Sequence, residues 1–199
     1  MGYNSQNNMK KQTKLIGLAI VAITSLCLGL VSCNNNQPTP QKEGKNLPEL
    51  AIGLYGLTAQ EATTLLTENG YTISASGSEQ LNFSKKDIEG AIVFDNEDKV
   101  GIVGIYPVNL KNVSELFIEW VNSVEKLGFI NVQNAQISFF DESEANYKNL
   151  SDFKIALKGK TDGELTHIEF IVFNSIGLPM GCMCEKDENG LFWAMVQVD

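Results

Sequence analysis

His167 is the only histidine in the chain, so a Ser-His-Asp or Cys-His arrangement would have to use it. The alternating apolar residues from Leu165 to Phe173 predict a strand that places His167 and Glu169 on the face opposite Ile168. No recognised nucleophile motif accompanies this histidine. We therefore predict a solvated strand histidine and name no catalytic residue.

Cys182-Met183-Cys184 is the second group of residues with possible chemistry. With Met180, the two cysteines place three sulfur side chains on one strand face, and together with His167 they could hold a copper(I)-like ion. The Cys-x-Cys spacing differs from the Cys-x-x-Cys of zinc knuckles and thioredoxin-like sites. Such cysteines also pack well as small buried hydrophobes, and a disulfide between them would be strained. We favour core packing and keep metal or redox use as the alternative.

Acidic segments are the remaining candidates for binding a metal ion. Residues 185–190 alternate acidic or amide oxygens before a glycine, like the start of an EF-hand calcium loop. Their twelfth position is Val196, where a bidentate glutamate is needed, and strands are expected on both sides. A hairpin turn accounts for the same residues, and segments 95–98 and 141–144 read as solvated turns. We expect no cofactor.

Two groups of aromatic residues could contact a partner. Trp193 shares one face of the last predicted strand with Leu191 and Met195, where it is either buried or offered to a ligand. A second possible surface flanks an acidic segment and consists of Phe139, Phe140 and Tyr147.

The first 33 residues carry the features of an export signal. Three lysines precede a mostly apolar run from Leu15 to Leu30. The run is shorter than the roughly 20 residues that span a hydrocarbon core, so a transmembrane helix is the weaker interpretation. Leu30-Val31-Ser32-Cys33 resembles the lipobox of bacterial lipoproteins. This resemblance implies cleavage before Cys33 and acylation of Cys33; an ordinary signal peptide is the alternative.

Composition limits what the mature chain can bind. After Cys33 there are 12 lysines, no arginine and all 24 acidic residues, so the formal net charge is −12. Such a chain is a poor candidate for binding nucleic acid, and anionic lipid surfaces repel it. Attachment to the membrane would therefore depend on the lipid on Cys33. We expect the partner to be an envelope protein or a cell-wall component. We predict that the protein is located in the cell envelope of a Gram-negative-type bacterium, anchored at the outer membrane and facing the periplasm.

Three regions follow from these patterns. We predict a lipoprotein signal peptide over 1–32, a lipidated cysteine and flexible tether over 33–47, and a compact domain over 48–199. The domain is expected to consist of two similar halves, at about 50–108 and 109–199. Each half has the order helix, glycine, aromatic residue, strand and hairpin.

Helix and strand signals recur in both halves. Capping boxes are predicted at Thr58 with Glu61 and at Asn112 with Glu115, each before an apolar stripe. The predicted hairpins join Gly90–Asp95 to Val100–Tyr106, Phe153–Leu157 to Leu165–Phe173, and Pro179–Cys184 to Leu191–Val198. Few helices and many hairpins predict an α+β fold of two tandem helix-plus-antiparallel-sheet units with an extra C-terminal hairpin.

Two further resemblances concern the domain. Gly56 to Ala62, with Leu66, Gly70 and Tyr71, resembles the opening helix of PASTA modules, which bind cell-wall fragments or serve as spacers. Pro48 replaces the proline expected close ahead of Gly56, and we interpret the likeness as a shared way of starting a helix. The element order is similar to the β-lactamase-inhibitor-protein-like fold and to small envelope-assembly lipoproteins. That similarity implies protein binding rather than catalysis.

The expected function is that of a lipid-anchored envelope protein, a non-catalytic binding or assembly module with an unknown ligand. The alternative is a metal-binding or redox envelope protein that uses Cys182 and Cys184. An enzyme that works with carboxylates alone is a third possibility.

Overall fold

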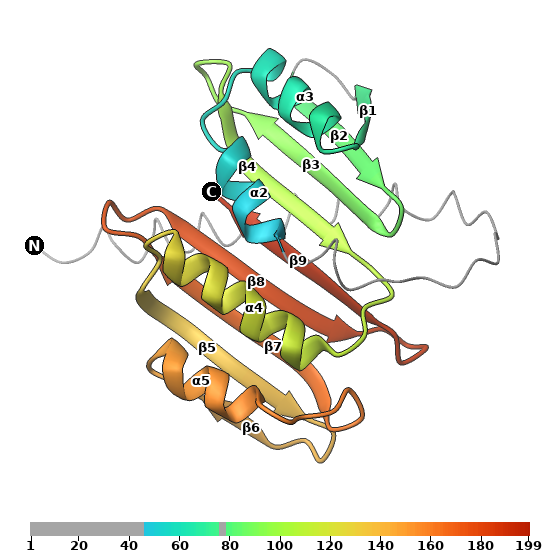
Figure 1. Cartoon of the computed structure of the whole chain (residues 1–199), viewed down its shortest axis with the longest axis vertical. Helices are drawn as coiled ribbons and strands as arrows, with labels where there is room; N and C mark the ends of the chain where they lie inside the picture. Colours follow the sequence, from blue (N-terminus) through green and yellow to red (C-terminus); the bar gives the residue numbers. More distant parts are fainter. Residues whose placement is uncertain (1–45, 76–78) are drawn as a thin grey trace, which may run out of the picture. The chain divides into compact units, whose positions relative to one another are not determined.

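A nine-stranded antiparallel sheet dominates the computed structural model of this chain, which describes residues 46–75 and 79–199 (Figure 1). Its strands lie in the order β1-β2-β3-β4-β9-β8-β7-β5-β6. The predicted signal peptide, Cys33 and all but the end of the predicted tether lie outside the described residues. The α+β class is confirmed, and the description as two tandem units stays a prediction.

The described part of the chain contains four helices and nine strands. They are α2 (Leu47–Leu54), α3 (Ala59–Glu68), β1 (Thr72–Ala75), β2 (Gln80–Lys85), β3 (Ile88–Phe94), β4 (Val100–Pro107), α4 (Val113–Lys126), β5 (Asn131–Phe139), β6 (Glu144–Asn146), α5 (Leu150–Leu157), β7 (Leu165–Phe173), β8 (Pro179–Lys186) and β9 (Phe192–Val198).

Two antiparallel meanders meet at the centre of the sheet. Strands β1 to β4 form one, and β5, β7, β8 and β9 form the other. Their last strands pair with each other, Val103 with Val198, Gly104 with Gln197 and Ile105 with Val196. The predicted C-terminal hairpin is therefore β8 and β9, and it lies in the interior of the sheet.

All four described helices lie on one side of the sheet (Figure 1). The strands turn their apolar positions to that side, as β9 does with Ala194, Val196 and Val198, all of which are fully buried. Helix α4 covers another part of that side with the predicted stripe of apolar residues, including Trp120 and Phe117, whose ring centroid lies 6.0 Å from that of Phe170 on β7. We call the opposite side, which carries no described helix, the open face. No helix in the described part of the chain has the length and hydropathy needed to cross a membrane.

Helix α2 lies over the junction of the two meanders, where it packs on both β4 and β9. It buries Leu47, Ala51 and Leu54 almost completely. The sequence analysis did not predict this helix and assigned Leu47 to the tether, which is wrong. Pro48 lies in the first turn of α2, where proline fits well.

Of the two predicted capping boxes, the first is confirmed and the second is wrong. Glu61 N–H donates to Thr58 Oγ1, and Thr58 N–H donates to Glu61 Oε2 at 2.9 Å. Asn112 instead adopts a left-handed conformation, with φ of 52°, and its side chain caps nothing.

The start of α4 is capped from a distant loop. The backbone N–H groups of Asn112 and Val113 donate to the Asp162 carboxylate at 2.7 and 2.9 Å. Ser114 Oγ donates to the Lys160 carbonyl at 2.7 Å in the same loop. In that loop Glu164 accepts from the Thr161 N–H and hydroxyl and from Lys160, which lowers the pKa of Glu164 to about 2.

The prediction of a strand over Phe153–Leu157 is wrong, because these residues belong to helix α5. Leu150, Phe153 and Leu157 are buried, which is helical spacing. Asn149 caps the helix by accepting from the Asp152 N–H at 2.8 Å. In a short apolar run the helical and extended patterns overlap, so local sequence did not separate them. Strands β2 and β6 were also missed.

Replacing Asp162 with alanine should uncap α4. We expect a loss of about 1–2 kcal/mol in the free energy of unfolding, because two backbone N–H groups at the helix start lose their acceptor. Urea denaturation monitored by circular dichroism measures this loss.

Glu115→Gln is the matched control, since the unused partner of the predicted capping box is exposed. We expect this variant to change the free energy of unfolding by less than about 0.5 kcal/mol. A larger loss for Glu115→Gln than for Asp162→Ala would contradict the observed cap.

Candidate functional site

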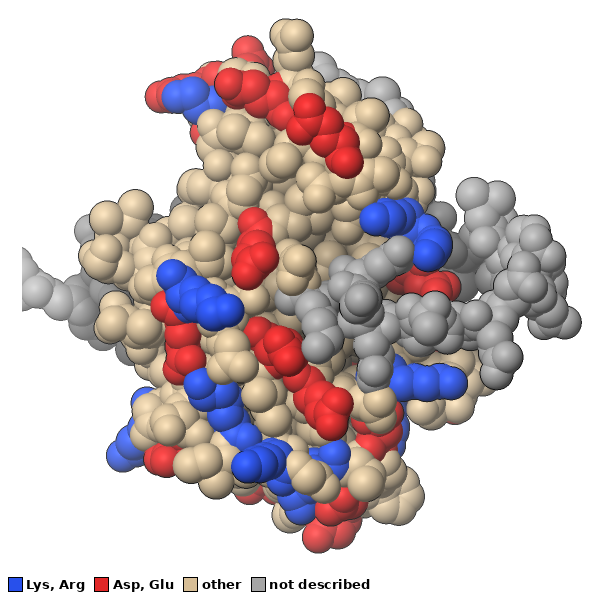
Figure 2. Space-filling model, viewed as in Figure 1, with Lys and Arg blue, Asp and Glu red and all other residues tan. Residues whose placement is uncertain are grey.

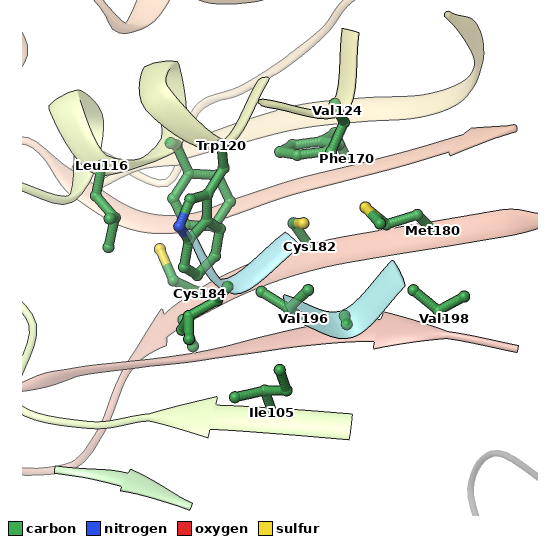
Figure 3. Close-up of a cluster of buried hydrophobic side chains, with 14 of the residues drawn as sticks. Ile105, Leu116, Trp120, Val124, Phe170, Met180, Cys182, Cys184, Val196 and Val198 are labelled. Atoms are coloured by element: carbon green, nitrogen blue, oxygen red, sulfur yellow. The ribbon is translucent and has the colours of Figure 1, made fainter. Parts of the chain in front are cut away.

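Three of the four sulfur side chains of β8 point into the core. Cys182 and Cys184 are free and buried, and Met180 lies beside them on the same strand face. Figure 3 shows these three side chains under α4, close to Trp120 and Phe170. The preferred reading of the two cysteines as core residues agrees with this placement.

Burial makes the two thiols poor candidates for metal or redox chemistry. Desolvation raises the pKa of both Cys182 and Cys184, so the thiolate that binds metals or attacks disulfides is strongly disfavoured. His167 lies on the other side of the sheet, because its strand neighbour Ile168 is the residue that pairs with Cys184. His167 therefore does not converge with the three sulfur side chains, as the possible copper site would require.

His167 lies on the open face, as the alternation of β7 predicted. Its Nε2 is 3.6 Å from Glu169 Oε2, and both side chains are about one quarter exposed, at 24% and 28%. Across the sheet His167 pairs with Glu185 on β8 and with Ser138 on β5. Ser138 Oγ accepts from Gln136 Nε2 at 3.5 Å.

The carboxylates of the acidic turns accept hydrogen bonds from backbone N–H groups of the same turn. Asp95 accepts from the N–H groups of Lys99 and Glu97, which lowers the pKa of Asp95. Asp187 accepts from the Leu191 N–H at 2.8 Å and the Asn189 N–H at 2.9 Å, and its pKa is lowered too. These bonds connect each carboxylate to the backbone of its own turn. Among the described residues, no group of three or more His, Cys, Asp or Glu side chains is arranged to hold a metal ion.

The three aromatic residues near 141–144 do not form one surface. Tyr147 packs edge-on against the buried Phe153, with ring centroids 5.8 Å apart. Phe139 packs against the core beneath Lys160, whose Nζ is 5.2 Å from the ring centroid. Phe140 is 75% exposed. Of the three, Phe140 is therefore the one largely available to a partner.

The helix side of the molecule is charged. Figure 2 shows acidic side chains over the end with α3 and interspersed lysines and acidic side chains over α4 and α5. Lys154 Nζ on α5 lies 2.7 Å from Glu125 Oε2 on α4, which ties the two helices together. Paired charges of this kind are typical of a solvated helix layer.

The centre of the open face carries large apolar side chains. On β9, Trp193 and Met195 point to this face, and Met195 pairs with Met183 on β8. Tyr106 on β4 lies at the position beside Met195, since its neighbour Ile105 pairs with Val196. All four side chains are partly exposed. We call Tyr106, Met183, Trp193 and Met195 the aromatic–methionine centre.

Glycine at position 104 sets the position of the Tyr106 ring. A Cβ at Gly104 would lie 2.5 Å from Tyr106 Oη and 3.0 Å from its Cζ, so the ring leans over the space that a side chain would occupy. The tyrosine therefore lies low against the sheet instead of standing away from it.

Uncharged polar residues flank the aromatic–methionine centre on both sides. They have amide or hydroxyl groups and follow the strand register across the sheet. On the β2 side they are Gln80, Asn82 and Ser84, and on the β5 side they are Asn134, Gln136 and Ser138. The open face thus combines an apolar centre with neutral hydrogen-bonding rows on β2 and β5, and Glu89 on β3 and Glu169 on β7 lie between these rows and the centre.

No protein-family profile matches this chain, and neither a curated protein nor a solved structure is significantly similar to it. The resemblances to lipoproteins, PASTA modules and the β-lactamase-inhibitor-protein-like fold stay predictions.

Sequence analysis identified part of this face and missed the rest. It named Trp193 and placed Met195 beside it, but it also included Leu191, which lies outside β9. It missed Tyr106 and Met183. The available signal was the alternation of β4 and β8, which turns these two residues away from their buried neighbours.

The buried thiols should be unreactive in the folded protein. We expect iodoacetamide to leave Cys182 and Cys184 unmodified in native buffer and to modify both in about 8 M urea, because exposure requires unfolding. Mass spectrometry of the proteolytic peptide that carries both cysteines measures this without interference from other cysteines. Rapid modification under native conditions would revive the redox alternative.

Proposed function

We propose that this chain is a lipid-anchored protein of the bacterial cell envelope that binds an envelope component through its open face and does no chemistry itself. Cys33 carries the lipid, and the aromatic–methionine centre is the contact surface. The protein faces the periplasm from the outer membrane.

The observation that supports this proposal most strongly is the composition of the open face. Its centre offers Trp193, Tyr106 and two methionines on a surface that no described element covers. Partly exposed aromatic and methionine side chains grouped on one uncovered surface are typical of a site that contacts a partner. The lipobox resemblance supplies the location in which that partner would be met.

Metal or redox use of Cys182 and Cys184 is not carried forward as a second function. Both thiols face the core and lie on the opposite side of the sheet from His167.

Lipidation can be tested by substitution of Cys33. We expect wild-type chain expressed in a Gram-negative host to incorporate an alkyne-labelled palmitate, and Cys33→Ser to lose the label and keep its signal peptide. Click chemistry followed by gel electrophoresis measures the label. Cys27→Ser is the matched control, since this cysteine lies inside the apolar run. Loss of label in Cys27→Ser alone would refute the assignment of Cys33.

Binding through the open face can be tested by a cysteine footprint. In Met195→Cys the new thiol lies in the aromatic–methionine centre, whereas Ile155→Cys places one on α5, where the native residue is 69% exposed. We expect maleimide to label Met195→Cys about fivefold or more slowly in intact envelopes than in purified protein, because the partner covers it.

Ile155→Cys should react at similar rates in both preparations. Native Cys182 and Cys184 contribute little label, because they are buried. Equal rates for Met195→Cys in envelopes and in purified protein would contradict the proposed binding face.

A further inference from the structure

We propose that the partner of the open face is a neutral polysaccharide, whose chain lies across the strands with sugar rings against the aromatic–methionine centre. This inference rests on the proposed function and names the chemical class of its ligand. Three features of the open face support it: its charge, its aromatic side chains and its rows of amides.

The charges of the open face disfavour an anionic ligand. The only two lysines in the described strands, Lys85 and Lys186, pair with the buried Ile88 and Phe192 and so do not belong to this face. Glu89, Glu144, Glu169 and Glu185 do point to it. A nucleic acid, an anionic lipid surface or a polyuronate would therefore meet carboxylates on this face and no lysine of the described strands.

The carboxylates of this face have uncharged or histidine neighbours across the sheet. Glu89 pairs with Tyr106. Glu169 and Glu185 both neighbour His167, which lies 3.6 Å from Glu169 and pairs with Glu185. Carboxylates in such surroundings can accept hydrogen bonds from sugar hydroxyls.

Trp193 and Tyr106 suit the apolar faces of pyranose rings. A pyranose presents C–H groups on its ring faces and hydroxyls around its edge, so it packs well on an aromatic ring with polar neighbours. Gly104 allows the Tyr106 ring to lean down over the sheet, because no Cβ occupies the space beside it. Small residues continue along this row of the sheet, since Gly104 pairs with Ala91 and Gln197 pairs with Gly181.

The flanking amides match a ligand that repeats. Asn82, Gln197 and Asn134 occupy one line of register partners across the sheet, through Ala91, Gly104, Gly181 and Ile171. Successive amides are three strands apart, so at about 4.8 Å per strand they are separated by roughly 14 Å and can contact only a ligand that extends across the sheet. An amide both donates and accepts, so each can bind adjacent hydroxyls of a polyol.

Intrinsic fluorescence provides a direct test, because the chain has two tryptophans and Trp120 is fully buried. The full lipidated protein, in a detergent without a sugar headgroup, is titrated with soluble neutral β-glucan, mannan and xylan, and with alginate as the polyanion. We expect at least one neutral polysaccharide to shift the emission of Trp193 and to retard the protein in affinity gels. Alginate should do neither.

Variants assign the binding to the open face. We expect Trp193→Ala and Tyr106→Ala to weaken retardation by about tenfold or more, and Phe140→Ala, the matched exposed aromatic, to change it by less than about twofold. In Trp193→Phe the fluorescence shift should vanish, because the remaining Trp120 has no contact with the ligand. Raising the salt from about 50 to about 500 mM should change neutral binding less than twofold.

The outcomes separate this inference from the proposed function. Absence of binding to all three neutral polysaccharides overturns the polysaccharide proposal, and so does preferential binding of alginate. If the Met195→Cys footprint is protected in either case, the proposed function still stands, with a partner of another chemical class. Binding that salt abolishes would show an ionic partner and would also overturn the polysaccharide proposal. If Met195→Cys is labelled equally fast in envelopes and in purified protein, the proposed function itself is contradicted.

Discussion

The pairing of β4 with β9 is the constraint on which the rest of this domain depends. Three register pairs join two four-stranded meanders into one sheet, and Val103, Ile105, Val196 and Val198 at this junction are fully buried. Helix α2 covers the junction with Leu47, Ala51 and Leu54. Without this pairing each meander would expose an edge strand and half of an apolar face, which are the usual routes to aggregation. The junction also brings Tyr106 beside Met195, so the aromatic–methionine centre exists only when the two meanders are joined.

Sequence analysis succeeded where the determinants are local. Thr58 and Glu61 cap α3 from three residues apart, and the alternation of β7 placed His167 on the correct face. It failed where the decisive partner is distant. Asp162 caps a helix whose start lies 50 residues earlier, and no local pattern relates the two. The run Phe153–Leu157 is short and apolar, so its helical state depends on the core it covers.

The open face shows the same division. Alternation identifies which residues of one strand share a face, and this was enough to single out Trp193. It does not give the order of strands, because register between β4 and β9 is fixed by tertiary packing. Tyr106 lies beside Met195 only through that order, whereas Met183 pairs with Met195 within the β8–β9 hairpin. The preferred interpretation of Cys182 and Cys184 agrees with the structure for a related reason, since the apolar residues around them already indicated a buried strand face.

The place of α2 has a mechanical consequence. It is the first described element after the predicted tether, and it lies on the central junction of the sheet. If the chain is held at Cys33, tension along the tether reaches the domain at Leu47 and acts to peel α2 from β4 and β9. The β-strands themselves would be loaded only after Leu47, Ala51 and Leu54 had left the core. The junction is then the part of the fold that an external force would challenge first, and α2 is the element that resists it.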